Sequence, residues 1–115
     1  MNSKELANKI AKLIIKKKGD NIRIFDLKKL TPMTDYFVVC TAQSELQVKA
    51  ISDFVSEETR KLNQKPWHSE GYQNRSWVLL DYVDVVVHIF LPETRKFYNL
   101  EGLWGDADIT EIKDK

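Results

Sequence analysis

A sequence of 115 residues with a formal net charge of +1 at pH 7 predicts one domain over residues 1–115, long enough to bury a sizeable core. This near-neutral charge excludes a protein that coats nucleic acid over its whole surface, because such a protein requires a clear positive excess. No apolar stretch reaches the roughly 20 residues of a membrane span, and the N-terminal lysines lack the apolar core of a signal peptide, so we expect no membrane contact and a cytoplasmic protein.

The first segment predicts an amphipathic helix from Asn2 to Lys18. Its apolar residues fall at helical spacing on one face, at Leu6, Ile10, Leu13 and Ile14. Asn2 and Glu5 have the spacing of a capping box. We expect Gly19 to end the helix, because glycine takes positive φ without strain.

A short β-strand is predicted next, followed by a second strand and a second helix. The first strand is Ile22 to Leu27, and Tyr36 to Thr41 is a continuous apolar run typical of a central strand covered on both faces. The helix begins at Ser44, which forms a capping-box pair with Gln47. Because a helix follows the strand, we expect parallel pairing between that strand and the next one.

The second half of the sequence predicts further strands around one or two short helical turns. Lys65 to Glu70 has the character of an edge strand, and Ala107 to Ile112 alternates and is charged, which also favours an edge. Two apolar runs predict covered strands at Ser76 to Leu80 and Val85 to Leu91. Glu93 to Trp104 predicts the short helical turns. The fold class is therefore α/β, with a small mixed sheet packed with helices.

The turn between the two apolar strands contains an unsuitable residue. Tight two-residue hairpins favour glycine or asparagine, whereas the connection from Asp81 to Asp84 contains Val83. We therefore expect a wider turn or a bulge at this position.

Residues with catalytic or metal-binding chemistry are few and poorly spaced. Asp81 and Asp84 are separated by three positions, which does not place both carboxylates on one face of a strand. His68 and His88 show no metal-ligand spacing with Cys40, which lies in an apolar run and is expected to be a buried, inert thiol. These patterns predict no cofactor and no metal site.

The aromatic side chains near the C-terminal end are the best candidates for a binding surface. Phe90 and Phe97 are expected in the core, whereas core and interface roles both remain open for Trp77, Tyr98 and Trp104. Large amphipathic rings are efficient interface anchors, because they offer much area and lose few rotatable bonds.

The residues from Arg95 to Trp104, together with Asp81-Tyr82 and the run Val85 to Phe90, closely resemble the ribosomal silencing factor family, the Iojap-related proteins. The resemblance extends from about Leu6 to Ala107. The sequence departs from the family pattern at three positions. Ala42 and Val83 stand where the family usually has glycine, and Gln47 stands where histidine is common.

This resemblance implies a fold related to the nucleotidyltransferases and a non-enzymatic repressor of translation. The family binds the large ribosomal subunit through its ribosomal protein number fourteen and blocks joining of the small subunit. It also tends to form homodimers. We expect the contact surface to comprise Trp77, His88, Arg95, Tyr98, Leu100, Glu101 and Trp104.

Individual roles follow from the chemistry of these residues. Glu101 is expected to pair with a basic group of the ribosomal protein, so that its reversal to lysine costs about 2–5 kcal/mol of binding. Arg95 is an alternative partner that holds Glu101 or Asp81 in place. The lysine-rich first helix is expected to make a peripheral contact with ribosomal RNA.

Two other functions remain open from the sequence. One is an adaptor for assembly of the large subunit, which requires the same docking surface. The other is a nucleotidyltransferase-like protein with weak metal-dependent activity. The latter is disfavoured, because the segment Thr41 to Ser44 lacks the glycine of a phosphate-binding turn.

Overall fold

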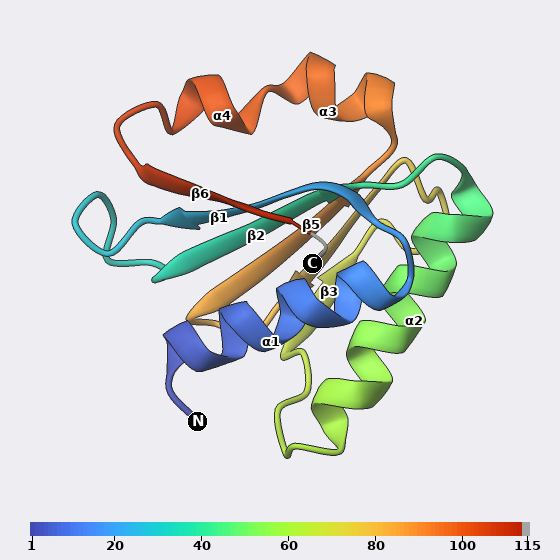
Figure 1. Cartoon of the computed structure of the whole chain (residues 1–115), viewed down its shortest axis with the longest axis horizontal. Coiled ribbons are helices and arrows are strands. Elements are labelled where there is room, and N and C mark those ends of the chain that lie inside the picture. Colours follow the sequence, from blue (N-terminus) through green and yellow to red (C-terminus); the bar gives the residue numbers. More distant parts are fainter. Residues whose placement is uncertain (114–115) are drawn as a thin grey trace.

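The computed structural model describes residues 1–113, which form a mixed sheet with helices on both faces. In chain order the elements are α1 (Ser3–Lys16), β1 (Asp20–Asp26), β2 (Tyr36–Thr41), α2 (Glu45–Arg60), β3 (His68–Glu70), β4 (Trp77–Asp81), β5 (Val85–Phe90), α3 (Pro92–Tyr98), α4 (Leu100–Leu103) and β6 (Asp108–Ile112). Helices α1 and α2 lie on one side of the sheet, and α3 and α4 lie on the other (Figure 1). The predicted α/β fold class is confirmed.

The strand order is β3-β4-β5-β2-β1-β6, so both predicted edge strands are at the edges. The central strands β2 and β5 pair in parallel, and the other neighbours pair antiparallel. Parallel pairing of β2 was expected with the next strand in sequence, and that partner is wrong. After α2 the chain goes to the edge at β3 and returns through β4, so β5 is the strand that reaches β2.

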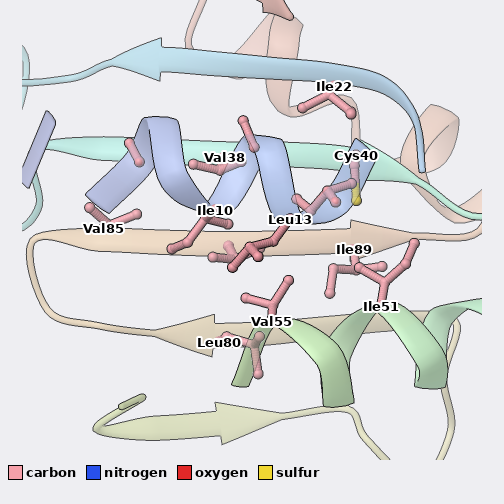
Figure 2. Packing of buried hydrophobic residues seen from close by; sticks show 14 of the residues in the cluster. Ile10, Leu13, Ile22, Val38, Cys40, Ile51, Val55, Leu80, Val85 and Ile89 are labelled. Atoms are coloured by element: carbon pink, nitrogen blue, oxygen red, sulfur yellow. The ribbon is translucent and has the colours of Figure 1, made fainter. Parts of the chain in front are cut away.

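Alternation along the strands divides the apolar side chains between the two faces of the sheet. One face packs against α1 and α2 and includes Val38, Cys40 and Ile89, which are fully buried. Figure 2 shows these side chains meeting Ile10 of α1 and Ile51 of α2. Each fully buried aliphatic side chain of this kind contributes about 1.5–3 kcal/mol, so this cluster is the main source of stability.

Helix α1 begins as predicted but ends differently. Asn2 and Glu5 form the full capping box, with Glu5 N donating to Asn2 Oδ1 at 2.8 Å. The residue with positive φ after the helix is Lys18, at 66°, and not Gly19. Gly19 is needed for a different reason, because a Cβ there would approach Ile14 Cγ2 to 2.3 Å.

The start of α2 is capped by Ser44, whose Oγ accepts a hydrogen bond from Gln47 N at 3.1 Å. The reciprocal half of the predicted capping box is wrong. The Gln47 side chain accepts from Gln43 N and donates to the carbonyl oxygens of Lys17 and Lys18. It therefore ties the start of α2 to the end of α1.

Residues 82–84 connect β4 to β5, and Tyr82 N donates to the Val85 carbonyl oxygen at 2.8 Å, so the wider turn expected from the sequence is not found and only Val83 and Asp84 lie outside the hydrogen-bonded ladder. Val83 has a φ of 75°, and Asp84 N donates to the carbonyl oxygen of Tyr82 at 3.0 Å. These features define a γ-turn, in which a β-branched residue at positive φ is strained. The Asp81 side chain supports the turn by accepting from Val83 N at 2.7 Å.

Candidate functional site

The sheet face opposite α1 and α2 carries the predicted aromatic residues. Its strands present Phe37 and Val39 from β2, Val86, His88 and Phe90 from β5, and Trp77 and Leu79 from β4. Helices α3 and α4 close one part of this face through a small core made of Phe25, Leu27, Val39, Phe90 and Leu100. The remaining part of the face stays accessible.

Six rings form a continuous row across this face, which we call the aromatic row: Phe97, Tyr98, Trp77, His88, Phe37 and Trp104. Successive ring centroids are 5.0, 4.6, 5.8, 4.4 and 5.9 Å apart. The row brings residues of β2, β4 and β5 together with the end of α3 and with Trp104, which follows α4. It thereby unites four of the predicted contact residues, namely Trp77, His88, Tyr98 and Trp104.

Exposure differs greatly along the aromatic row. Phe97 is 79% exposed and Tyr98 is 50% exposed, whereas Trp77 and Trp104 are half-buried. The expectation that Phe97 belongs to the core is therefore wrong, and the expectation for Phe90, which is fully buried, is confirmed. Phe97 lies on α3, a short helix with no buried residue, which explains why the core does not take it up.

His88 is the most buried member of the aromatic row. It is 4% exposed, and its Nδ1 accepts a hydrogen bond from Trp77 Nε1 at 3.1 Å. Burial lowers the pKa of His88 to about 3, because no charged group compensates for removing the ring from water. His88 is therefore neutral at physiological pH and holds the Trp77 ring in place.

Next to the aromatic row lies an open groove of about 590 Å³. Its walls are Thr31, Met33, Thr34, Phe37, Trp67, Leu79, Asp81, Val83, Val86, His88 and Trp104. Met33 is 82% exposed and Trp67 is 77% exposed, so large apolar side chains stand at the rim. Exposed apolar surface of this kind marks binding sites in soluble proteins.

Arg95 fixes the α3–α4 segment to the sheet and is 11% exposed in its side chain. Its Nε donates to Glu101 Oε2 at 3.2 Å, and its Nη1 donates to Thr41 Oγ1 at 2.9 Å and to the Asn21 carbonyl oxygen at 2.7 Å. The alternative that Arg95 holds Glu101 is thus what the geometry shows. Asp81 lies elsewhere, at the β4–β5 turn.

Glu101 faces the interior of this segment more than the solvent. Burial alone would raise the pKa of Glu101, but hydrogen bonding and the charge of Arg95, together with the charge of Arg23, keep its pKa below the usual value. Leu100 is 8% exposed and lies in the small core. These two residues shape the surface from beneath, whereas Tyr98 and Trp104 reach it.

Several residues of this surface are not among the contact residues predicted from the sequence. Leu103 is 72% exposed beside the row, and Met33, Trp67 and Val83 line the groove. Their only sequence signal is that large apolar residues lie outside the helical and alternating patterns. This signal does not show whether such a residue is exposed or is buried in the core.

The chemistry of a metal or thiol site is not apparent in the described part of the chain. Within residues 1–113 no group of three or more His, Cys, Asp and Glu side chains is placed to hold a metal ion. Cys40 is fully buried, as predicted, and burial raises the pKa of its thiol to about 12. No helix within the same residues is both long enough and apolar enough to cross a bilayer.

Comparison with known proteins places the whole sequence in one family. A family model described as ribosomal silencing factor during starvation matches residues 1–115. The sequence is 34% identical over 113 residues to ribosomal silencing factor RsfS of Halalkalibacterium halodurans, covering 98% of this chain and 97% of the relative. It is also 40% identical over 103 residues to the chloroplastic protein Iojap of Zea mays, covering 90% of this chain and 45% of the relative.

A solved structure supports the same relationship. A crystal structure of a Chromobacterium violaceum protein matches with a TM-score of 0.88 and 35% sequence identity, over 91% of this chain and 88% of the other. The fold and the sequence agree over nearly the full length, so this chain belongs to the ribosomal silencing factor family.

Proposed function

We propose that this protein represses translation by binding the large ribosomal subunit through its ribosomal protein number fourteen, on the face that meets the small subunit. The family membership supports a role on the ribosome. The observation that carries the binding proposal is the aromatic row, which leaves the rings of Phe97 and Tyr98 exposed on a sheet face that helices only partly cover.

The physical basis of the proposal is the burial of preorganised rings. Tyr98 packs on Trp77, and Trp77 is held by His88, so little side-chain entropy is lost when a partner covers these rings. Tryptophan and tyrosine in such settings are the residues that most often dominate binding energy. We propose Trp77, Tyr98 and Trp104 as the anchors, with His88, Leu100, Arg95 and Glu101 supporting them.

The proposed mechanism requires only affinity and bulk. A protein bound at the subunit interface prevents the small subunit from approaching, and no bond has to be made or broken. We therefore propose a non-enzymatic, cytoplasmic factor that consists of a single domain. In the absence of ribosomes we propose that it forms a homodimer, which gel filtration combined with light scattering tests directly.

The role proposed for Glu101 needs a refined test, because Glu101 already pairs with Arg95 inside the protein. Reversal to lysine would disturb this ion pair as well as any contact with a ribosomal cation. Tyr98→Ala is a cleaner variant, since Tyr98 is 50% exposed and is not itself a member of the small core. Leu46→Ala is the matched control, because Leu46 is 73% exposed on α2. Helix α2 lies on the side of the sheet opposite to α3 and α4 (Figure 1).

The binding experiment is co-sedimentation with purified large ribosomal subunits. Wild-type protein and Leu46→Ala are expected to pellet with the subunit. Tyr98→Ala is expected to bind at least about tenfold more weakly, as for a binding-energy hot spot. Equal sedimentation of all three proteins would remove Tyr98 from the interface, and absence of wild-type protein from the pellet would reject the proposed function.

A further inference from the structure

The chain leaves the two parallel strands of the sheet toward opposite sides. The end of β2 leads into α2 on one side, and the end of β5 leads into α3 on the other side (Figure 1). Where neighbouring connections diverge in this way, a crevice opens outside the carboxyl ends of the strands, and α/β sheets commonly bind small ligands there. An open cavity of about 600 Å³ lies at this place, which is a size typical of small-molecule sites.

This cavity, which we call the strand-end crevice, is polar and carries more positive than negative charge. It is bounded by Thr41, the last residue of β2, by Pro92, the first residue of α3, and by Asn99, which joins α3 to α4. Four of its lining residues are charged, three basic and one acidic: Arg23, Arg95, Lys96 and Glu101. Asp20 lies nearby, because its carboxylate accepts from Gln43 Nε2 at 2.9 Å. The balance of charge stays positive when Asp20 is included.

Two guanidinium groups share one carboxylate oxygen unequally. Arg95 donates to Glu101 Oε2 from both Nε and Nη2. Its Nη1 donates to the Thr41 hydroxyl and to the Asn21 carbonyl oxygen, so Arg95 has little left for a ligand. Arg23 Nη1 lies 3.7 Å from the same oxygen of Glu101, which is beyond hydrogen-bond distance. The Arg23 side chain is 37% exposed, and its shielded Nε has no partner among residues 1–113. Arg23 therefore offers its terminal N–H groups, rather than Nε, to an incoming anion.

Lys96 supplies a second available cation at the rim of the crevice. It is exposed on α3 and forms no ion pair with another side chain of residues 1–113. A guanidinium with several N–H donors, together with a flexible ammonium group, is a donor set that proteins use for phosphate.

The uncharged walls indicate what else the ligand carries. They are mostly amide and hydroxyl side chains, which can bond the hydroxyl groups of a sugar. Among the described residues no aromatic ring lines the crevice, so a flat apolar ligand finds no stacking partner there. The walls therefore favour a hydrophilic anion of small size.

We propose that the strand-end crevice binds a small phosphate-bearing metabolite with a hydroxylated body, such as a sugar phosphate or a nucleotide. The phosphate group lies between Arg23 and Lys96, and hydroxyl groups of the body bond Asn21 and Asn99. Side chains hold the phosphate, so the site does not require the glycine that residues 41–44 lack. The proposal is independent of the proposed function, because the crevice is at the ends of the strands and the aromatic row is on the sheet face.

Three single substitutions test the site. Arg23→Gln and Lys96→Gln each remove one positive charge and keep a polar side chain. Lys29→Gln is the matched control, because Lys29 is exposed and follows β1. That end of β1 pairs with the first residue of β2, so Lys29 lies at the opposite end of the sheet from the crevice. A thermal melt shows that each variant is folded before binding is measured.

Binding is measured by isothermal titration calorimetry with the full chain at low salt and without ribosomes. The probes are inorganic phosphate, ribose 5-phosphate and ATP, and the phosphate-free controls are ribose and adenosine. Wild type and Lys29→Gln are expected to bind ribose 5-phosphate or ATP more tightly than inorganic phosphate, and to bind neither control. Arg23→Gln and Lys96→Gln are expected to bind about tenfold more weakly or worse, because each loses a charged hydrogen bond to the phosphate. The tighter of the two organic probes identifies the class of body.

A measurement on the wild-type protein checks the location without relying on a variant that must fold. Addition of the tighter probe should shift the backbone ¹H–¹⁵N resonances of Asn21, Thr41 and Lys96. Shifts confined to the aromatic row or to α1 would place the anion elsewhere and overturn the proposal.

Several results of the titrations would also overturn the proposal. Absence of binding by every probe at millimolar concentration would reject the site, and equal binding by all four proteins would show that the phosphate does not contact Arg23 or Lys96. If inorganic phosphate binds as tightly as both organic probes, the hydroxylated body is rejected. If a single-stranded oligoribonucleotide binds and neither organic probe does, the crevice is a nucleic-acid contact instead. None of these results bears on subunit binding, because no ribosome is present.

Discussion

His88 connects the interior of the protein with its proposed binding surface. On one side its Nδ1 accepts from Trp77, and on the other its ring lies 4.4 Å from the ring of Phe37. Aromatic side chains and the sheet surround it, so water does not compensate a charge on the ring. Burial therefore keeps the ring neutral, and this neutral state preserves the bond to Trp77.

The stability of the protein should depend on the protonation of His88. Its pKa is about 3 in the folded state and has the ordinary histidine value of 6.5 in the unfolded state, so the unfolded state binds more protons between these values. The unfolding free energy should therefore fall as pH decreases below 6.5, by about 2 kcal/mol between pH 7 and pH 5. Denaturant titrations at both pH values measure this loss.

His88→Phe is the reference for this pH dependence. The variant lacks the titrating ring, so its unfolding free energy should change much less than that of wild type over the same interval. Lowered carboxylate pKa values, such as that of Glu101, act in the same direction at lower pH. An equal loss in both proteins would show that His88 does not cause it.

Val83 is expected to reduce stability through backbone strain. A β-branched residue at a φ of 75° is unfavourable, and its side chain is 53% exposed, so little burial offsets the strain. Val83→Gly should raise the unfolding free energy by about 1 kcal/mol, after the entropy cost of glycine in the unfolded chain is subtracted. Thermal or denaturant unfolding measures the change.

Val83→Ala separates strain from the loss of the valine side chain. Alanine retains a Cβ at positive φ, so this variant should gain much less stability than Val83→Gly. If both variants gain equally, the branched side chain rather than the backbone conformation is responsible.

The α3–α4 segment is held in position by partly buried polar contacts. Its two short helices are joined at Asn99, which has a φ of 48° and caps α4 with its side chain. Arg95 links the segment to Glu101, to Thr41 of β2 and to the backbone at Asn21. This bonding keeps Phe97 and Tyr98 on the surface although the segment buries few apolar residues.

Removing the carboxylate of Glu101 should weaken this attachment. Glu101→Gln leaves Arg95 buried with a weaker partner, and the unfolding free energy should fall by about 1–3 kcal/mol. Asp106→Asn, at an exposed position nearby, is the control for loss of one negative charge. Equal stability of Glu101→Gln and wild type would show that the remaining bonds of Arg95 hold the segment alone.

The basic helix α1 should contribute to binding through electrostatics. Replacement of Lys16, Lys17 and Lys18 by glutamine should reduce the salt dependence of binding to large subunits, by about 0.7–0.9 in the logarithmic slope for each lost phosphate contact. Replacement of Lys28 and Lys29, which follow β1, is the control. An unchanged slope would exclude contact between this helix and ribosomal RNA.

Most elements could be predicted from the sequence because their signals are local. Two capping residues, Asn2 and Ser44, identify where α1 and α2 begin. Two apolar runs identify the strands β2 and β5. The parallel partner of β2 could not be predicted correctly, because the path of the chain through β3 and β4 depends on pairing across the sheet. Local pattern also gave no sign that Lys18, rather than Gly19, takes positive φ.

The candidate site could be predicted only in part, for a related reason. Aromatic composition and family resemblance identified Trp77, Tyr98 and Trp104, but the exposure of Phe97 depends on how α3 sits on the sheet. The groove combines Met33, Trp67 and Val86, which are distant in sequence. The bond between Trp77 and His88 also follows from the pairing of β4 with β5.

The two faces of the sheet differ in how far helices cover them. Helices α1 and α2 cover one face and form the larger hydrophobic cluster together with the strands (Figures 1 and 2). The other face is only partly covered by α3 and α4, and it carries the aromatic row and the groove. If this second face is the binding surface that we propose, substitutions there should change binding while the main core remains intact.

We propose that this partly covered face docks on the large subunit and excludes the small one. Sucrose-gradient profiles of purified large and small subunits, with and without the protein, test it most directly. We predict that the protein lowers the peak of joined ribosomes, raises both free-subunit peaks and migrates with the large subunit alone. An unchanged peak of joined ribosomes, with the protein bound to the large subunit or left at the top of the gradient, would contradict the account.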